Sequence, residues 1–217
     1  MNLTAKITAI EPQTRRKNRV NVYLDGRYAF SLSNIVAERH SLAVGLDLTQ
    51  DDIGELLEEE SYYKALDTAF NFLSYRPRSE REVRLNLKKK RFSSEVADRV
   101  IQRLRDLGLI DDLAFASFWV DNRQSCRPRG TAAIRAELRS KGVNNDVIAE
   151  VAADVDEEEN AYRAAIKQAS RLRGLDYNTF RQRLGGYLVR RGFSYDAAAK
   201  VTRRLWEEGT TDSEPES

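Results

Sequence analysis

VRLNLKKKRF at residues 83–92, IRAELRSKGV at residues 134–143 and LGGYLVRRGF at residues 184–193 align with one another without a gap. They are offset by 51 and 50 residues, and each has an apolar side chain at its first, fifth and tenth position. A period of about 50 residues with helical spacing predicts stacked helical units. Because each unit is too short to bury its own apolar face, neighbouring units must share a core. We therefore expect a mainly α protein whose tandem three-helix repeats form an elongated, curved rod.

Capping residues and helix breakers divide each repeat into three helices. In the first repeat, a helix from Tyr62 should end before Pro77, Ser79 should cap the second helix, and Ser93 the third. Asp111 and Asn144 are suited to the same role in the second repeat. The expected repeats are residues 61–110, 111–155 and 156–208, followed by an acidic tail, 209–217, that we expect to be disordered. Gly185 and Gly186 fall inside the last middle helix and suggest a close helix approach or a bend.

Residues 1–60 have the two-residue period of β-strands. Apolar side chains alternate on both sides of Asp25-Gly26, a dipeptide that supplies the positive φ angles of a tight hairpin turn. Residues 6–10 should form a third strand and residues 46–48 a short fourth, before a helix that begins after Thr49 and reaches about Glu60. The segment thus predicts a small β-rich module.

One basic stretch of this module, Arg15, Arg16, Lys17 and Arg19, has two readings. It is either a solvated loop or a contact for phosphates or for an acidic partner.

Composition excludes several classes of function. Cys126 is the only cysteine and His40 the only histidine, so neither an intrachain disulfide nor a closed zinc site of the usual kind is expected. There is no phosphate-binding glycine loop, no paired-carboxylate signature and no histidine for a catalytic triad, so we expect no enzyme, cofactor or metal. No apolar run is long enough to span a membrane, and no secretion signal is visible, which favours a soluble, cytoplasmic protein.

Basic side chains gather in the first repeat, although the net charge of the chain is only +2. Residues 61–110 carry 12 basic and 6 acidic side chains. Arg84 and Lys88 lie one turn apart, opposite the apolar face, and recur in the second repeat as Arg135 and Arg139. The candidate contact residues for a polyanionic or acidic partner are Arg76, Arg78, Arg81, Arg84, Lys88, Lys90, Arg127, Arg129, Arg135, Arg139, Lys141 and Arg191. The alternative is a solvated helix face balanced by Glu80, Glu82 and Glu137.

Aromatic side chains in the second repeat have a simpler interpretation. Phe115, Phe118 and Trp119 have helical spacing beside apolar neighbours, which is more typical of a core than of a base-stacking platform. We expect Phe115 to be buried at the junction of the first two repeats, and Trp206 to pack within the last one.

Several of these segments together resemble the RecX family, bacterial regulators of the RecA recombinase. The resemblance lies in RPRSEREVR at 76–84, LGLIDDLAFASFWVDNR at 107–123, KGV at 141–143 and RGF at 191–193; Arg91 stands where a repeat-end glycine is usual. It implies a non-enzymatic modulator, and an inhibitor, that binds as a monomer in the groove of the RecA–single-stranded-DNA filament. A stand-alone nucleic-acid-binding module that contacts phosphates through its basic face is the alternative, and an adaptor for an unrelated protein is a third.

Overall fold

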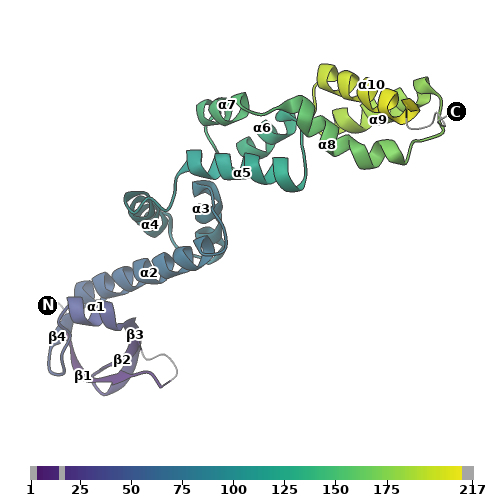
Figure 1. The fold of residues 1–217 in the computed structure, drawn as a ribbon. Helices are drawn as coiled ribbons and strands as arrows, with labels where there is room; N and C mark the ends of the chain where they lie inside the picture. The colour runs from purple at the N-terminus through teal and green to yellow at the C-terminus, as the bar shows by residue number, and fades with distance from the viewer. Residues whose placement is uncertain (1–3, 15–17, 212–217) are drawn as a thin grey trace. The chain divides into compact units, whose positions relative to one another are not determined.

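The computed structural model describes residues 4–14 and 18–211, which are mostly helical after a short sheet (Figure 1). Contacts divide the chain into two compact units. The first unit extends to Arg76 and includes Val83–Leu109; the second comprises Pro77–Glu82 and the chain from Ile110 onward. The first unit therefore holds the sheet and most of the first repeat, and the second holds the other two repeats.

The sheet confirms the predicted hairpin. Strands β1 (Thr4–Pro12), β2 (Arg19–Leu24), β3 (Arg27–Ser33) and β4 (Asp47–Thr49) pair antiparallel in the order β3-β2-β1-β4. Asp25 and Gly26 have φ angles of 49° and 77°, as the tight turn between β2 and β3 requires. A short helix that we did not predict, α1 (Asn34–Arg39), follows β3; the Ser33 side chain caps it by accepting a bond from the Val36 N–H.

Helix α2 (Gln50–Leu73) is one continuous helix of 24 residues, so the predicted break near residue 61 is wrong. No proline or glycine lies between Glu55 and Leu73 to interrupt it. Thr49 and Asp52 form a capping box at its start. Its first half contributes Leu56 to the core of the sheet, and its second half packs on α4 (Ser94–Asp106). The predicted boundary between residues 60 and 61 lies within α2.

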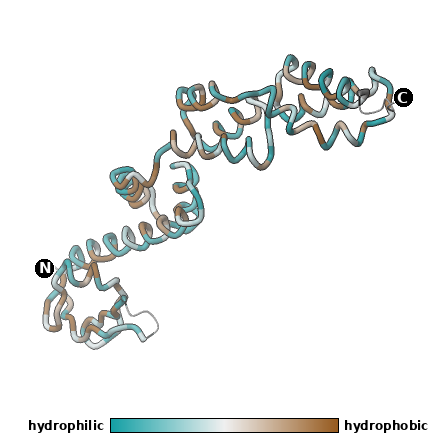
Figure 2. Tube along the Cα trace, in the orientation of Figure 1, coloured by the Kyte–Doolittle hydropathy of each residue, from teal (hydrophilic) through white to brown (hydrophobic). Residues whose placement is uncertain are grey.

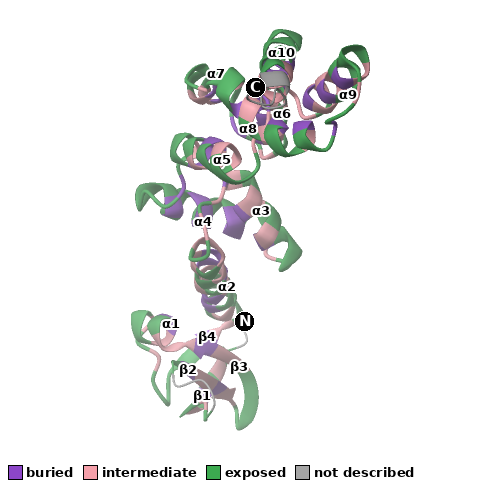
Figure 3. Ribbon diagram, turned by 45° about the vertical axis from the view of Figure 1, so that its right-hand side comes forward, coloured by how far each residue is buried: buried purple, intermediate pink, exposed green. Residues whose placement is uncertain are grey.

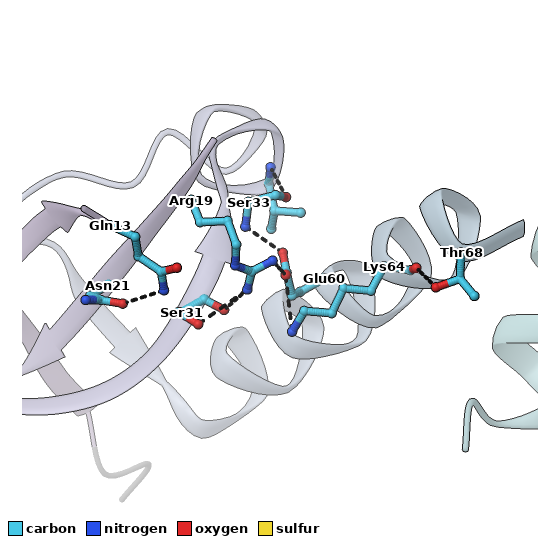
Figure 4. A network of polar contacts seen from close by, with 9 residues as sticks. Gln13, Arg19, Asn21, Ser31, Ser33, Glu60, Lys64 and Thr68 are labelled. Carbon is cyan, nitrogen blue, oxygen red and sulfur yellow. Dashed lines mark hydrogen bonds and ion pairs between the residues drawn. The ribbon is translucent and has the colours of Figure 1, made fainter. Parts of the chain in front are cut away.

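A buried ion pair fixes α2 to the sheet (Figure 4). Arg19 Nη1 lies 2.6 Å from Glu60 Oε1, and the Ser33 N–H donates to Glu60 Oε2 at 2.7 Å. Burial alone would raise the pKa of Glu60, but the Ser33 N–H, the Arg19 guanidinium and Lys64 together lower that pKa below its ordinary value. Arg19 is therefore a buried structural residue of β2, and our placement of it in an exposed basic stretch is wrong. The other residues of that stretch, 15–17, lie outside the described part of the chain.

The remaining helices follow the predicted order of three per repeat. They are α3 (Glu80–Lys89) and α4; α5 (Asp112–Cys126), α6 (Thr131–Ser140) and α7 (Asn145–Ala153); and α8 (Glu157–Ser170), α9 (Tyr177–Arg190) and α10 (Tyr195–Thr211). Ser93, Asp111 and Asn144 act as N-caps, as predicted. Residues 209–211 of the predicted acidic tail belong to α10, and residues 212–217 lie outside the described part.

Each repeat buries one face of its helices, visible as purple stripes in Figure 3 and as brown segments among hydrophilic ones in Figure 2. The equivalent residues Leu87, Leu138 and Leu188 are all fully buried. Phe115 is buried as predicted, but it packs within the core of the second repeat beside Ile134 and Leu138. Trp206 is half-buried against Tyr177 and Phe180 in the last repeat, with ring centroids 5.4 and 5.2 Å away. The tandem helical pattern is thus confirmed at the level of its core.

The glycine pair in α9 does not mark a close helix approach. A Cβ atom added to Gly185 would meet no atom within 4 Å, and one added to Gly186 would meet only the flexible end of Arg190. Of our two expectations for this pair, a close approach or a bend, the close approach is therefore wrong.

Candidate nucleic-acid and protein interface

In the first unit, the outward face of α3 carries cations opposite the buried Val83 and Leu87. Arg84 forms an ion pair with Asp98 of α4, and its side chain is 39% exposed. Lys88 follows one turn later and is exposed, as are the next three residues, Lys89 to Arg91. Among the residues that the structure describes, no carboxylate is paired with Lys88, so this side chain can reach an anion without breaking an ion pair.

In the second unit, α6 presents the corresponding pair. Arg135 is half-buried and Arg139 exposed, opposite the buried Ile134 and Leu138. Arg139 Nε donates to Asn145 Oδ1 at 3.0 Å, which holds its side chain towards the start of α7. The recurrence seen in the sequence is therefore a recurrence of outward-facing cations on two middle helices.

Lys141 has a structural role that the sequence did not show. Its Nζ lies 2.7 Å from Glu82 Oε1, with side chains only 18% and 17% exposed, and its carbonyl oxygen accepts from Ser79 Oγ at 2.8 Å. Lys141 Nζ also lies 4.1 Å from the centre of the Trp119 ring. These contacts fix the first turn of α3 to the second repeat within the second unit.

Arg191, at the equivalent position of the third repeat, binds the second repeat in a similar way. Its Nη2 donates to the Pro128 carbonyl at 3.0 Å, and its own carbonyl accepts from the Gly130 N–H at 3.1 Å. We call these contacts of Lys141–Gly142 and Arg191–Gly192, made to the start of the preceding middle helix, the repeat clasps. A basic residue recurs at this position because the second and third repeats each use it to bind the preceding repeat.

The glycines of the clasps allow very close packing. A Cβ atom at Gly142 would lie 2.9 Å from Arg81 Cβ, and one at Gly192 would lie 2.4 Å from Ala133 Cβ. Both glycines have positive φ angles, 84° and 87°, which side chains disfavour. Any larger residue at either place would push the two repeats apart.

Two of the acidic side chains invoked as a balance for the basic face, Glu82 and Glu137, contact residues other than Arg84, Lys88, Arg135 and Arg139. Glu82 binds Lys141, and Glu137 accepts bonds from Trp119 Nε1 at 2.8 Å and from Arg123 Nε at 2.6 Å. The Arg123 guanidinium also stacks over Trp119, 4.5 Å from the ring centre. This cluster was absent from our candidates, because its members come from two helices and share no sequence motif.

The other candidates differ in exposure. Arg81, Lys90 and Arg127 are exposed, whereas Arg76, Arg78 and Arg129 are half-buried. Within residues 4–14 and 18–211, no group of three or more His, Cys, Asp or Glu side chains could hold a metal ion. None of the helices described is long and apolar enough to cross a membrane.

Comparison with known proteins gives matches along the chain. Four family models match: the "Regulatory protein RecX N-terminal domain" at residues 5–49, and the first, second and third three-helix domains of RecX at residues 65–104, 111–151 and 156–202. The "Regulatory protein RecX" of Bacillus subtilis is 34% identical over 215 residues, covering 97% of this chain and 81% of the relative. That of Listeria monocytogenes serotype 4a is 33% identical, covering 89% and 73%.

Solved structures agree with the family models. A crystal structure of regulatory protein RecX has a TM-score of 0.72 at 30% identity and covers 94% of this chain and 99% of its own. The crystal structure of RecX from Lactobacillus salivarius has a TM-score of 0.62 at 25% identity, covering 68% and 97%. With tandem three-helix domains behind a small sheet, and with relatives of this identity along most of its length, the chain belongs to the RecX family of regulatory proteins.

Proposed function

We propose that this protein regulates the RecA recombinase, as an inhibitor, by binding in the groove of the RecA–single-stranded-DNA filament. The relatives are named regulatory proteins, and the resemblance of residues 107–123 and of the repeat ends to the RecX family carries the choice of RecA. The protein acts through binding, as a monomer in the cytoplasm, with no catalytic step and no cofactor.

The observation that carries this proposal is the recurrence of outward cations. Arg84 and Lys88 on α3 have counterparts in Arg135 and Arg139 on α6, each opposite a buried face. Solvated helix faces are usually mixed in charge, and the nearby Glu82 and Glu137 are engaged by other residues. Two middle helices are therefore each able to contact phosphates or acidic side chains of the filament.

The repeat clasps sharpen the list of contact residues. Lys141 and Arg191 stood among the candidates, but both hold a neighbouring repeat. We therefore assign the principal contacts to Arg84, Lys88, Arg135 and Arg139. The remaining exposed candidates, Arg81, Lys90 and Arg127, surround them in the sequence.

The proposal is tested by adding the purified protein to RecA that hydrolyses ATP on single-stranded DNA. We expect the rate to fall as the protein is added, and the inhibition to weaken as salt rises, because it depends on exposed charges. Unchanged hydrolysis at a several-fold excess of the protein over RecA would contradict the proposal. Bovine serum albumin at the same concentration is the control for nonspecific protein effects.

A further inference from the structure

Arg91 has a left-handed backbone conformation, and the equivalent residues of the other two repeats are glycines. Its φ angle is 67°, and the equivalent residues of the next two repeats are Gly142 at 84° and Gly192 at 87°. Side chains disfavour this left-handed region because Cβ crowds the following carbonyl oxygen. An arginine at this position therefore reduces stability relative to glycine, and backbone outliers of this kind are concentrated at functional sites.

The first repeat has no repeat before it to hold. In the second and third repeats, the equivalent segment forms a repeat clasp, and a Cβ atom there would collide with the preceding helix start. The Arg91 side chain would prevent such docking in the same way. The end of α3 is thus a clasp position that has been left open.

Four consecutive cations stand at this open position. Lys88, Lys89, Lys90 and Arg91 are all exposed. Within the described part of the chain, no carboxylate is paired with any of the four, whereas Arg84 and Lys141 each have one. Their charges are therefore available to a partner, and we call residues 88–91 the α3-end patch.

We propose that the α3-end patch binds the phosphate groups of single-stranded nucleic acid. Contacts to phosphates come mainly from lysine and arginine and need no apolar surface. A protein partner fits less well, because lysine is depleted at the centres of protein interfaces, which are apolar and aromatic. Leu85, one turn earlier, is 56% exposed, but one leucine does not make such a centre.

Cations on successive helical turns also suit a nucleic acid strand. Lys88 follows Arg84 by four residues, which separates their Cα atoms by about 6 Å along the helix axis. Neighbouring phosphates of an extended strand have a similar separation, so the patch continues the line of charges that begins at Arg84. The inference deepens the proposed function by naming a part that touches nucleic acid, and it is testable without RecA.

The test measures binding of the whole chain to fluorescein-labelled oligothymidine by anisotropy at several salt concentrations. The triple variant K89Q/K90Q/R91Q removes three charges of the patch and leaves Lys88 intact. The matched control, R173Q/R181Q/R183Q, removes three exposed arginines of the third repeat. We expect the patch variant to bind at least about tenfold more weakly at low salt. The slope of log affinity against log salt should fall in magnitude by about 2, since each phosphate contact on a single strand contributes about 0.7.

The single variant Arg91→Gly separates binding from folding. Glycine removes the strain at φ 67°, so the melting temperature should rise, while the affinity for oligothymidine and the salt slope should both fall. A purely structural role of Arg91 would not give these opposite changes.

Several results would overturn the assignment. The first is wild-type protein whose binding to oligothymidine does not depend on salt. The second is an equal loss of affinity in the patch and control variants. The third is displacement of labelled oligothymidine by polyglutamate as effectively as by unlabelled oligothymidine at equal charge. The last result would place the patch among surfaces for acidic proteins. None of these results bears on inhibition of RecA, which is measured separately, so either proposal can fail alone.

Discussion

At the scale of single residues, Glu60 links the sheet to α2. Its carboxylate is 2% exposed. It forms ion pairs with Arg19 and Lys64 and accepts a hydrogen bond from the Ser33 N–H. Replacing it with glutamine leaves the Arg19 charge without a counterion in a buried place. We expect Glu60→Gln to lower the free energy of unfolding of the sheet by about 3–5 kcal/mol, the range for removing one member of a buried pair.

Hydrogen exchange of the amides in β1–β3 measures this change, since Trp119 and Trp206, the two tryptophans of the chain, both lie in the second unit. Glu58→Gln is the control, because Glu58 pairs with Arg99 at an exposed place. Equal protection of the sheet in both variants would show that the buried pair contributes little.

The same carboxylate makes the stability of the sheet depend on pH. The folded-state pKa of Glu60 lies below its ordinary value of 4.5. A lowered carboxyl pKa stabilises the folded state fully above the unfolded pKa, and this contribution is lost as the pH falls through the folded pKa. As the pH falls below about 4.5, the wild-type sheet should therefore lose more stability than that of Glu60→Gln. Parallel stability curves for the two proteins would contradict this account.

Two glycines of the third repeat should respond to alanine in opposite directions. Gly185 lies within α9, and a Cβ atom added to it would meet no atom within 4 Å, so Gly185→Ala should stabilise the protein by up to about 1 kcal/mol. Gly192→Ala would place a methyl group 2.4 Å from Ala133 Cβ at a positive φ angle, and should destabilise the protein by about 2 kcal/mol or more. Urea denaturation followed by tryptophan fluorescence reports on both, since Trp206 lies in this repeat; changes of the same sign would disprove the distinction.

At the scale of elements, the repeat clasps decide what a recurring basic residue does. Lys141→Gln removes a half-buried ion pair and should lower the stability of the second unit by about 1–3 kcal/mol, as for other hydrogen bonds to charged groups. Lys90→Gln, at the equivalent exposed position, should leave stability unchanged. Thermal melts of both variants make the comparison, and equal melting temperatures would show that the Lys141 clasp does not stabilise the second unit.

Local chemistry made most elements predictable, and long-range contacts account for the errors at Arg19 and at the repeat clasps. The hairpin at Asp25-Gly26 and the caps at Ser93 and Asp111 depend on residues within a few positions of each other. Arg19, by contrast, pairs with a residue 41 positions away, so its sequence neighbours could not show that it is buried.

The clasps could not be predicted for the same reason. Lys141 and Arg191 reach partners 59 and 63 positions earlier. The period of the sequence located these residues correctly in each repeat, but a basic side chain suits a clasp and a phosphate contact equally well. Arg91 did carry a signal in the sequence, since it departs from glycine at a recurring position.

At the scale of the whole molecule, tandem repeats present one helix face more than once. The outward cations of α3 and α6 recur in this way, while their counterparts in α9 are Gly185 and Val189. Repetition matters because single exposed charges contribute little, whereas several that act on a polyanion add together. Under the proposed function, the affinity for the filament is the sum of many weak contacts.

The measurement that tests this account most directly is inhibition of RecA-driven ATP hydrolysis by R84A/K88A/R135A/R139A. A fourfold variant of exposed third-repeat arginines, R171A/R173A/R181A/R183A, is the control with the same change of charge. Arg191 is excluded from the control because it belongs to a clasp. We predict that the first variant keeps its helicity and melting temperature but no longer inhibits, while the control inhibits almost as wild type does. A normally folded first variant that still inhibits RecA at the wild-type concentration would contradict the account.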